Sequence, residues 1–179
     1  ANSIAYLDND GELNYYARHK QQILDVTNPS FYSNTEYYLY YANGGSFSVY
    51  DGKERRYLGY IQNHPYAFGD SLAAIHDFSG YFYVYEQGML IELEQQPVLR
   101  VTAGDNTLAY INHIGQFRVY LHGEQMDVDS YAPIAFQAAA NTVAYIDNYN
   151  YLKVLWNGEI TELTHFAQIN CLSTIINDE

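Results

Sequence analysis

The sequence predicts an all-β protein built from five copies of one unit of about 35 residues, and three observations support this. Tyrosine is unusually abundant, with 21 of the 179 residues, and aromatic residues are favoured on the half-buried surfaces of strands. Apolar and polar residues alternate with the two-residue period of a strand, and no stretch carries helical spacing over three turns. The third observation is that the chain resembles itself at a fixed interval.

The repeat is clearest at one apolar core position in each copy. These equivalent positions are Leu13, Phe47, Phe82, Phe117 and Leu152. Their spacings are 34, 35, 35 and 35 residues, which is too regular for coincidence. Each position follows a short turn that separates two alternating runs, so each copy contains a hairpin.

Four short strands in up-and-down order account for each unit. The turns of the first hairpins are Asn9-Asp10-Gly11, Asn43-Gly44-Gly45, Phe78-Ser79-Gly80, His113-Ile114-Gly115 and Tyr149-Asn150. Gly and Asn accept the positive φ that tight hairpins require. A further turn and a third strand follow, and then a shorter run that begins in four copies at proline. Those prolines are Pro29, Pro65, Pro97 and Pro133, and proline is tolerated as the first residue of a strand.

A unit of this kind cannot bury both of its faces alone, so it must stack on its neighbours. Radial stacking gives a β-propeller, in which only short edges remain. The chain opens in the second strand of a unit, and residues 166–176 align with the first strand of the next. We therefore expect a single five-bladed domain over residues 1–179, in which this C-terminal strand completes the N-terminal blade.

In period and strand pattern the chain resembles β-propeller repeat proteins as a class, over nearly its whole length. The Trp-Asp signature of one propeller family is absent, because Trp156 is followed by Asn157. A five-bladed lectin of the tachylectin type looks similar in blade number, without a shared ligand motif. The resemblance implies the fold and points to no particular family.

The amino-acid composition limits the kinds of partner that the protein can bind. The formal net charge is −13, from 8 Lys+Arg against 21 Asp+Glu, so the field of the protein opposes binding to nucleic acid. No apolar run approaches 18 residues, and no membrane span is expected. The single cysteine, Cys171, forms no intramolecular disulfide or cysteine-based zinc site. The low lysine content and a first residue, Ala1, that is not methionine suggest an exported bacterial protein or an excised domain. We expect an extracellular, periplasmic or cell-surface location.

Two motifs invite a catalytic interpretation. Gly69-Asp70-Ser71-Leu72 resembles the short motif of a lipase and esterase family, in which serine is the nucleophile. The same phase of the repeat holds Gly104-Asp105, which favours a turn instead. Glycosidase propellers place carboxylates on their innermost strands, but none of the predicted inner runs contains Asp or Glu. We therefore predict that the protein is not an enzyme.

Metal and cofactor sites are not expected. Asp8-Asn9-Asp10-Gly11-Glu12 has neither the length nor the flanking helices of an EF-hand, and a hairpin turn explains it. No histidine pair has the helical i, i+4 spacing of a zinc site. His76 and His113 fall near equivalent turns, and solvated turn histidines are the simpler interpretation.

The polar face that carries the hairpin turns is the candidate ligand-binding surface. Its predicted site residues are Asp8, Asn9, Asn43, His76, Asp77, Asn112, His113, Asp147 and Asn148. Amides and carboxylates suit hydroxyl-rich ligands such as glycans, and tyrosines also suit a protein partner. The competing interpretation is that repeat turns simply favour Asn, Asp and Gly. We expect a non-catalytic binding or scaffold module; the alternative is a structural module of a larger cell-surface protein, and a hydrolase ranks third.

Overall fold

The computed structural model describes residues 3–60 and 66–165, and every regular element in these ranges is a β-strand. The strands form five antiparallel sheets in which neighbours along the chain are also neighbours in the sheet. Sheets 2 to 5 have four strands each, and sheet 1 has three among the described residues. Sheet 1 corresponds to the second, third and fourth strands of the other sheets.

The strand bounds follow the chain sheet by sheet. Sheet 1 contains β1 (Ser3–Leu7), β2 (Leu13–Ala17) and β3 (Lys20–Asp25). Sheet 2 contains β4 (Phe31–Asn34), β5 (Leu39–Asn43), β6 (Ser46–Tyr50) and β7 (Arg55–Tyr60). Sheet 3 contains β8 (Ala67–Phe68), β9 (Leu72–His76), β10 (Phe82–Glu86) and β11 (Met89–Glu94). Sheet 4 contains β12 (Arg100–Ala103), β13 (Thr107–Ile111), β14 (Phe117–Leu121) and β15 (Glu124–Asp129). Sheet 5 contains β16 (Ala135–Ala139), β17 (Thr142–Ile146), β18 (Tyr151–Trp156) and β19 (Glu159–His165).

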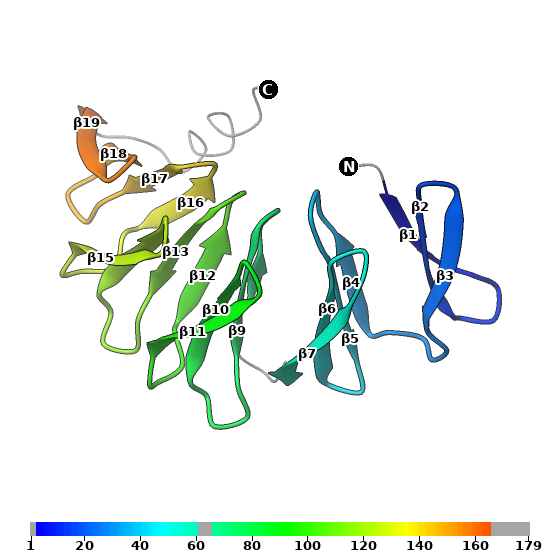
Figure 1. The fold of residues 1–179 in the computed structure, drawn as a ribbon. Coiled ribbons are helices and arrows are strands. Elements are labelled where there is room, and N and C mark those ends of the chain that lie inside the picture. The colour runs from blue at the N-terminus through cyan, green and yellow to red at the C-terminus, as the bar shows by residue number, and fades with distance from the viewer. Residues whose placement is uncertain (1–2, 61–65, 166–179) are drawn as a thin grey trace.

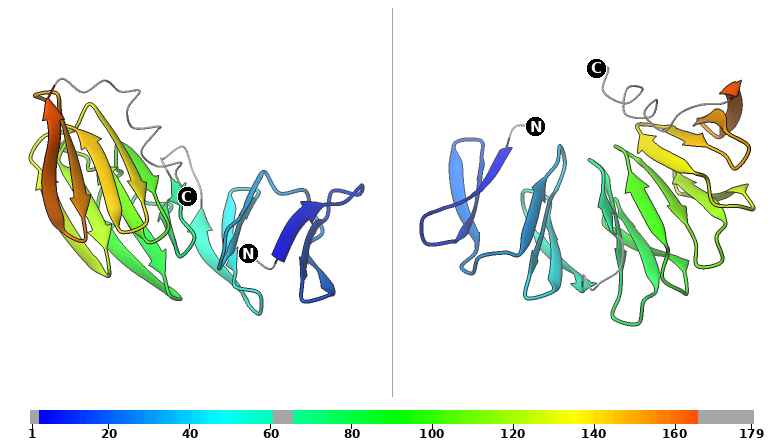
Figure 2. Two further views of the ribbon diagram at one scale, coloured as in Figure 1. Left: turned by 90° about the horizontal axis from the view of Figure 1, so that it is seen from above. Right: turned by 180° about the vertical axis from the view of Figure 1, so that it is seen from behind.

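The five sheets stand side by side in chain order along an arc (Figure 1). Sheets 3, 4 and 5 meet closely through their first strands, because β8 contacts β12 and β12 contacts β16. The two further views show sheet 1 and sheet 5 at opposite ends of the arc (Figure 2). The first strands therefore line the inner side of the arc, and the last strands form its outer rim.

One irregularity recurs at the same place in all five sheets. The pairing between the third and fourth strands of each unit shifts immediately after the repeated core residue, at Leu13, Phe47, Phe82, Phe117 and Leu152. A β-bulge of this kind bends the strand and re-aims the next side chain. The residue after the core position is thus aimed in a similar way in every sheet.

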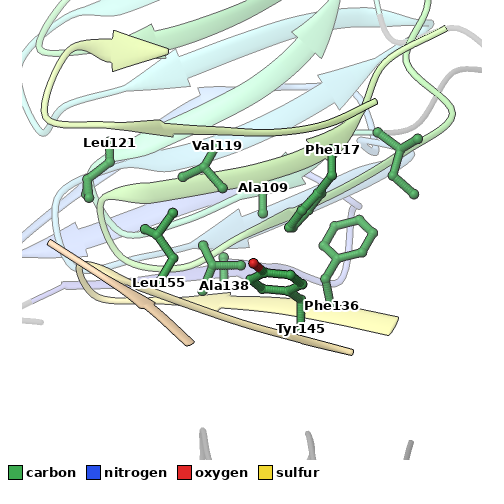
Figure 3. Packing of buried hydrophobic residues seen from close by; sticks show 10 residues of the cluster. Ala109, Phe117, Val119, Leu121, Phe136, Ala138, Tyr145 and Leu155 are labelled. Atoms are coloured by element: carbon green, nitrogen blue, oxygen red, sulfur yellow. The ribbon is translucent and has the colours of Figure 1, made fainter. Parts of the chain in front are cut away.

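Most of the core lies between successive sheets, and one further cluster, which includes Ile146 and Leu152, lies within sheet 5. Between sheets 4 and 5, Phe117 and Val119 of β14 pack against Phe136 of β16 and Tyr145 of β17 (Figure 3). Similar clusters join sheets 1 and 2, sheets 2 and 3, and sheets 3 and 4. Alternation makes this possible, because each sheet offers one set of apolar side chains to the preceding sheet and the other set to the following one.

The turns between first and second strands form a second line of contacts along the inner side. The Ser71 hydroxyl donates to the Asp105 carbonyl at 2.9 Å, and the Ser71 amide donates to the same oxygen at 3.0 Å. One sheet further on, the side-chain amide of Asn106 donates to Asn141 at 2.6 Å. Each bond spans 34 or 35 residues, which is one repeat. We call this series the inner ladder.

The predicted fold class is confirmed: the protein is all-β, with five blade-like sheets of short antiparallel strands, as in a five-bladed propeller. The expected closing strand within residues 166–176 lies outside the described residues and stays a prediction.

Candidate functional site

Four of the nine predicted site residues cap their own hairpin turns. In each case one side-chain oxygen accepts hydrogen bonds from the backbone amides two and four residues later. For Asp77 these amides are those of Ser79, at 2.8 Å, and Tyr81, at 2.9 Å. Asp8, Asn112 and Asp147 repeat the pattern with distances of 2.8–3.2 Å. These side chains use at least one oxygen for the turn, as the competing interpretation expected.

Four other predicted residues take different positions. Asn9, His113 and Asn148 are exposed at the turn tips. His76 is instead buried at the end of β9, where its Nε2 accepts a hydrogen bond from the Val98 amide at 3.2 Å. His76 therefore lies inside the contact between sheets 3 and 4, away from the turn surface.

The ninth residue, Asn43, is the exception among the turns. The β5–β6 turn is closed by Gly44 and Gly45, whose φ angles of 57° and 83° suit a two-residue hairpin. Such a turn needs no side-chain cap, so the Asn43 amide is used elsewhere. It donates to the Asp25 carboxylate of sheet 1 at 3.2 Å and to the Thr27 hydroxyl. Asn43 therefore bridges two sheets.

A pocket of about 400 Å³ opens beside this bridge, between sheets 1 and 2. We call it the Asn43 pocket. It is lined by Asp25, Tyr41, Asn43, Ser46, Ser48, Arg55 and Tyr57. These side chains come from the end of β3 and from β5, β6 and β7, so one sheet supplies most of the wall.

The equivalent space between sheets 3 and 4 is filled by a polar network. The Arg118 guanidinium lies 2.6 Å from Glu94 and 2.7 Å from Asp127. The Tyr110 hydroxyl donates to the same Glu94 oxygen at 3.0 Å, and Gln125 donates to Tyr110 at 2.7 Å. Burial lowers the pKa of Arg118, but its bonds to Glu94 outweigh this and raise the pKa above its ordinary value. Arg118 therefore stays charged and holds the two sheets together.

The repeat explains why the Asn43 pocket is open. Asp25 occupies the position of Glu94, and Tyr41 occupies that of Tyr110. The residue that follows the β-bulge, however, is Ser48 where sheet 4 has the long side chain of Arg118. Similarly, Ser46 stands at the position of Gln116. Two short side chains thus leave a volume that a structural arginine fills elsewhere.

The charges around the pocket are balanced. Burial raises the pKa of Asp25, but hydrogen bonds from Thr27 and Asn43 outweigh it and hold the pKa below its ordinary value. Across the pocket, the proximity of the Tyr41 hydroxyl raises the pKa of Arg55. The pocket therefore offers a carboxylate, a guanidinium and several hydroxyls, which together donate and accept hydrogen bonds.

Exposed aromatic rings continue from the pocket rim. Tyr57 is a lining residue, and its ring lies 5.9 Å from that of Tyr60 in an edge-on arrangement. The Tyr60 ring in turn lies 6.2 Å from that of Phe78 on the β9–β10 turn. All three side chains are exposed. They form an aromatic row from sheet 2 to sheet 3.

The catalytic motif considered above has a structural explanation. The Ser71 hydroxyl is used in the inner ladder, where it donates to a backbone carbonyl. The described first strands β4, β8, β12 and β16 contain no Asp or Glu, so none of them carries an acid–base pair. Across residues 3–60 and 66–165, no three His, Cys, Asp or Glu side chains gather as metal ligands.

Sequence reasoning found Asn43 but missed the other pocket residues. Two features of the sequence could have indicated the pocket. The spacing from Leu13 to Phe47 is 34 residues instead of 35, which marks a shorter turn in the second copy. Ser48 is also the smallest residue at a position that holds Asn, Tyr, Arg or Lys in the other copies.

Several solved structures resemble the chain in fold. The computationally designed Ika8 protein is 17% identical, with a TM-score of 0.44 over 91% of this chain and 59% of that one. Hsv2p of Kluyveromyces lactis is 15% identical, with a TM-score of 0.49 over 86% and 58%. Human WBSCR16 is 9% identical, with a TM-score of 0.50 over 90% and 65%. The chain thus spans about three fifths of the length of the first two, and at these identities the likeness concerns the fold alone.

No curated protein sequence matches the chain. None of the described residues belongs to a helix long and apolar enough to cross a membrane. A family model does match, over residues 57–176, and its description is a 10-bladed beta propeller domain. Because this match covers more than half of the 179 residues, the chain belongs to the family of the 10-bladed beta propeller domain.

Proposed function

We propose that the chain is a non-catalytic binding module and that the Asn43 pocket holds a hydroxyl-rich ligand of the glycan class. The observation that carries this proposal is the replacement of a space-filling arginine by Ser48. The change leaves polar groups facing an open volume of about 400 Å³, which falls within the range of small-ligand sites.

The chemistry of the walls favours sugars over other small molecules. A sugar hydroxyl both donates and accepts, and the pocket offers acceptors at Asp25 and donors at Arg55. Tyr57 at the rim adds a ring face with an apolar body and a polar tip. Such a ring can cover the apolar face of a sugar while its hydroxyl stays in water.

A glycan array with the 179-residue chain and two variants tests this proposal. In Ser48→Arg the new side chain should occupy the pocket as Arg118 occupies its own site, and glycan binding should fall at least about tenfold. Ser130→Arg adds the same charge at an exposed site between sheets 4 and 5, and it should bind as the original does. Unchanged binding in Ser48→Arg would exclude the pocket as the site.

A protein partner is the second candidate, and the aromatic row favours it. Tyr is enriched at the energetic centres of protein interfaces. If the chain binds protein through this row, Tyr60→Ala should reduce capture of that partner more than Ser48→Arg does. The reverse order would assign the partner to the pocket.

We also propose that the protein acts outside the cytoplasm, at the cell surface or in the periplasm. The low content of Lys+Arg, 8 residues, and the high tyrosine content support this. Fractionation of the source cells with an antibody to the chain tests it, and recovery in the cytoplasm alone would contradict it.

A further inference from the structure

Tyr57 and Tyr60 stand on the same face of sheet 2 as the Asn43 pocket. In a regular strand, residues three positions apart point to opposite faces. The β-bulge between β6 and β7 adds one residue to β7, so Tyr57 pairs with Ser48. Tyr60 pairs with Ser46, two residues earlier on β6 and therefore on the same face. Since both serines line the pocket, the two tyrosine side chains project beside it.

The three rings of the aromatic row occupy positions that are polar in most other copies of the repeat. At the position of Tyr57, sheets 3 to 5 carry acidic residues, which are Glu92, Asp127 and Glu162. At the position of Tyr60, the same sheets carry Gln95, Ser130 and His165. At the position of Phe78, sheets 1, 4 and 5 carry Asn9, His113 and Asn148. Sheet 1 alone is apolar at the first two positions, with Ile23 and Val26. The repeat therefore does not require aromatic residues here, and they gather beside the open pocket.

The rings of the row remain largely in solvent. Tyr57 is 55% exposed, Tyr60 is 43% exposed and Phe78 is 73% exposed. Rings with this exposure gain little from packing, because the benefit is proportional to the apolar area removed from water. Contiguous exposed apolar groups on a soluble protein commonly mark a binding surface. A ligand that extends out of the pocket would meet this surface first at Tyr57.

The spacing and tilt of the rings favour a ligand made of linked units. Neighbouring ring centroids lie 5.9 and 6.2 Å apart, and the ring planes are turned by 82° and 73°. A flat, rigid ligand can cover one of these rings but cannot follow all three. A unit of a linear glycan is about as long as one of these steps, and rotation at each linkage lets successive units turn. Each ring can then cover the apolar face of one unit while the hydroxyls of the sugar stay in water.

We propose that the ligand is a linear glycan bound by one end, with its terminal unit in the Asn43 pocket and about one further unit on each ring of the aromatic row. This inference rests on the proposed function, which assigns a glycan to the pocket. The volume of about 400 Å³ suits the end of such a chain and not its whole length. Once the end is held, the following units bind the row as parts of the same molecule, so affinity grows with chain length.

Isothermal titration calorimetry of the full chain with gluco-, manno- and chito-oligosaccharides of one to six units tests the proposal. In a series that binds, the affinity should rise with length up to about four units and then level off. Tyr60→Ala and Phe78→Ala should each lower the affinity for the four-unit glycan roughly fivefold or more. Neither should change the affinity for the shortest glycan that binds, and the Phe78→Ala effect should begin at a greater length. Ser48→Arg should weaken binding at every length.

Tyr149 provides the matched control. Its ring is 72% exposed on the β17–β18 turn of sheet 5, away from the pocket, so Tyr149→Ala should bind every length as the original does. The three alanine variants each remove an exposed ring and should keep the circular dichroism spectrum of the original.

The outcomes separate this inference from the proposed function. An affinity that is independent of length, or a Tyr60→Ala loss that is equal at all lengths, would overturn the inference and leave the pocket as a glycan site. Absence of binding at every length would overturn both. Unchanged glycan affinity in Tyr60→Ala, together with reduced capture of a protein, would assign the row to a protein interface and contradict the inference.

Discussion

Gly69 offers a direct test of how the sheets are joined. A methyl group added there would lie 1.7 Å from the Gly104 carbonyl oxygen and 2.7 Å from the Asp105 carbonyl oxygen. Both atoms belong to the backbone of the next sheet, so no side-chain rotation relieves the contact. Gly69→Ala must therefore move sheets 3 and 4 apart at the inner ladder.

The cost can be worked out from what the displacement breaks. Overpacking in a tight site costs about 1–3 kcal/mol. The two hydrogen bonds from Ser71 to Asp105 would also be strained or lost, at about 1 kcal/mol each. We expect the free energy of unfolding to fall by about 3–5 kcal/mol. At this chain length that corresponds to a thermal midpoint lower by roughly 10 °C or more.

Urea unfolding followed by circular dichroism measures this change. Gly44→Ala is the matched control, because no atom lies within 4 Å of its added methyl group. Its cost comes from the φ of +57° alone and should be about 1–2 kcal/mol. If Gly69→Ala cost no more than Gly44→Ala, the close approach of the two sheets would be refuted.

Three further predictions concern polar contacts. Asp147→Ala should cost about 2 kcal/mol in urea unfolding because two turn hydrogen bonds are lost, whereas Asp147→Asn keeps an acceptor and should cost less. Burial raises the pKa of Asp147, but hydrogen bonds from Lys153 and from the turn amides outweigh burial and lower this pKa. The ionised Asp147 carboxylate therefore stabilises the folded state at pH values above its pKa in the unfolded chain, and this stabilisation is lost as the pH falls through its pKa in the folded state. Acid titrations of unfolding should show a weaker loss of stability below about pH 4 in Asp147→Asn; equal curves would contradict this. Arg118→Ala leaves Glu94 without its ion pair in a buried site, so the free energy of unfolding, measured by thermal unfolding, should fall by about 3 kcal/mol. A fall of less than about 1 kcal/mol would show that the polar network is dispensable for stability. Ser71→Ala should cost about 1 kcal/mol by the same measurement, and no change would remove it from the inner ladder.

The architecture could be predicted because the sequence signals within each repeat are local. Strand alternation and turn residues act within a few positions, and five copies reinforce the same pattern. The period identified the core residues Phe47, Phe82 and Phe117, all of which are fully buried. The number of strands per unit followed from the turns, and the structure confirms it.

The candidate site was less predictable because Asn and Asp at a turn can either cap it or face a ligand. Asp77 and Asn112 are caps, and Asn43 is free for another contact only because Gly44 and Gly45 close its turn. Composition alone does not separate these cases. The difference depends on the length of each turn.

His76 was placed wrongly from the sequence for a different reason. Its place in the repeat is that of Ile111 and Ile146, which are core positions, so the alignment itself indicates burial. His76 was assigned to the polar surface because it is adjacent to Asp77, which lies in the turn. The Asn43 pocket could not be foreseen in the same way, because it depends on how two sheets pack after Ser48 replaces a long side chain.

The inner ladder also determines how the molecule should come apart. Since each sheet is bonded and packed mainly to its immediate neighbours, stability is close to a sum of single-sheet and nearest-neighbour contributions. Amide hydrogens of β13 and β14, in a sheet with a partner on both sides, should then exchange with solvent most slowly, and those of β1 and β2 sooner. Opening would then advance one sheet at a time.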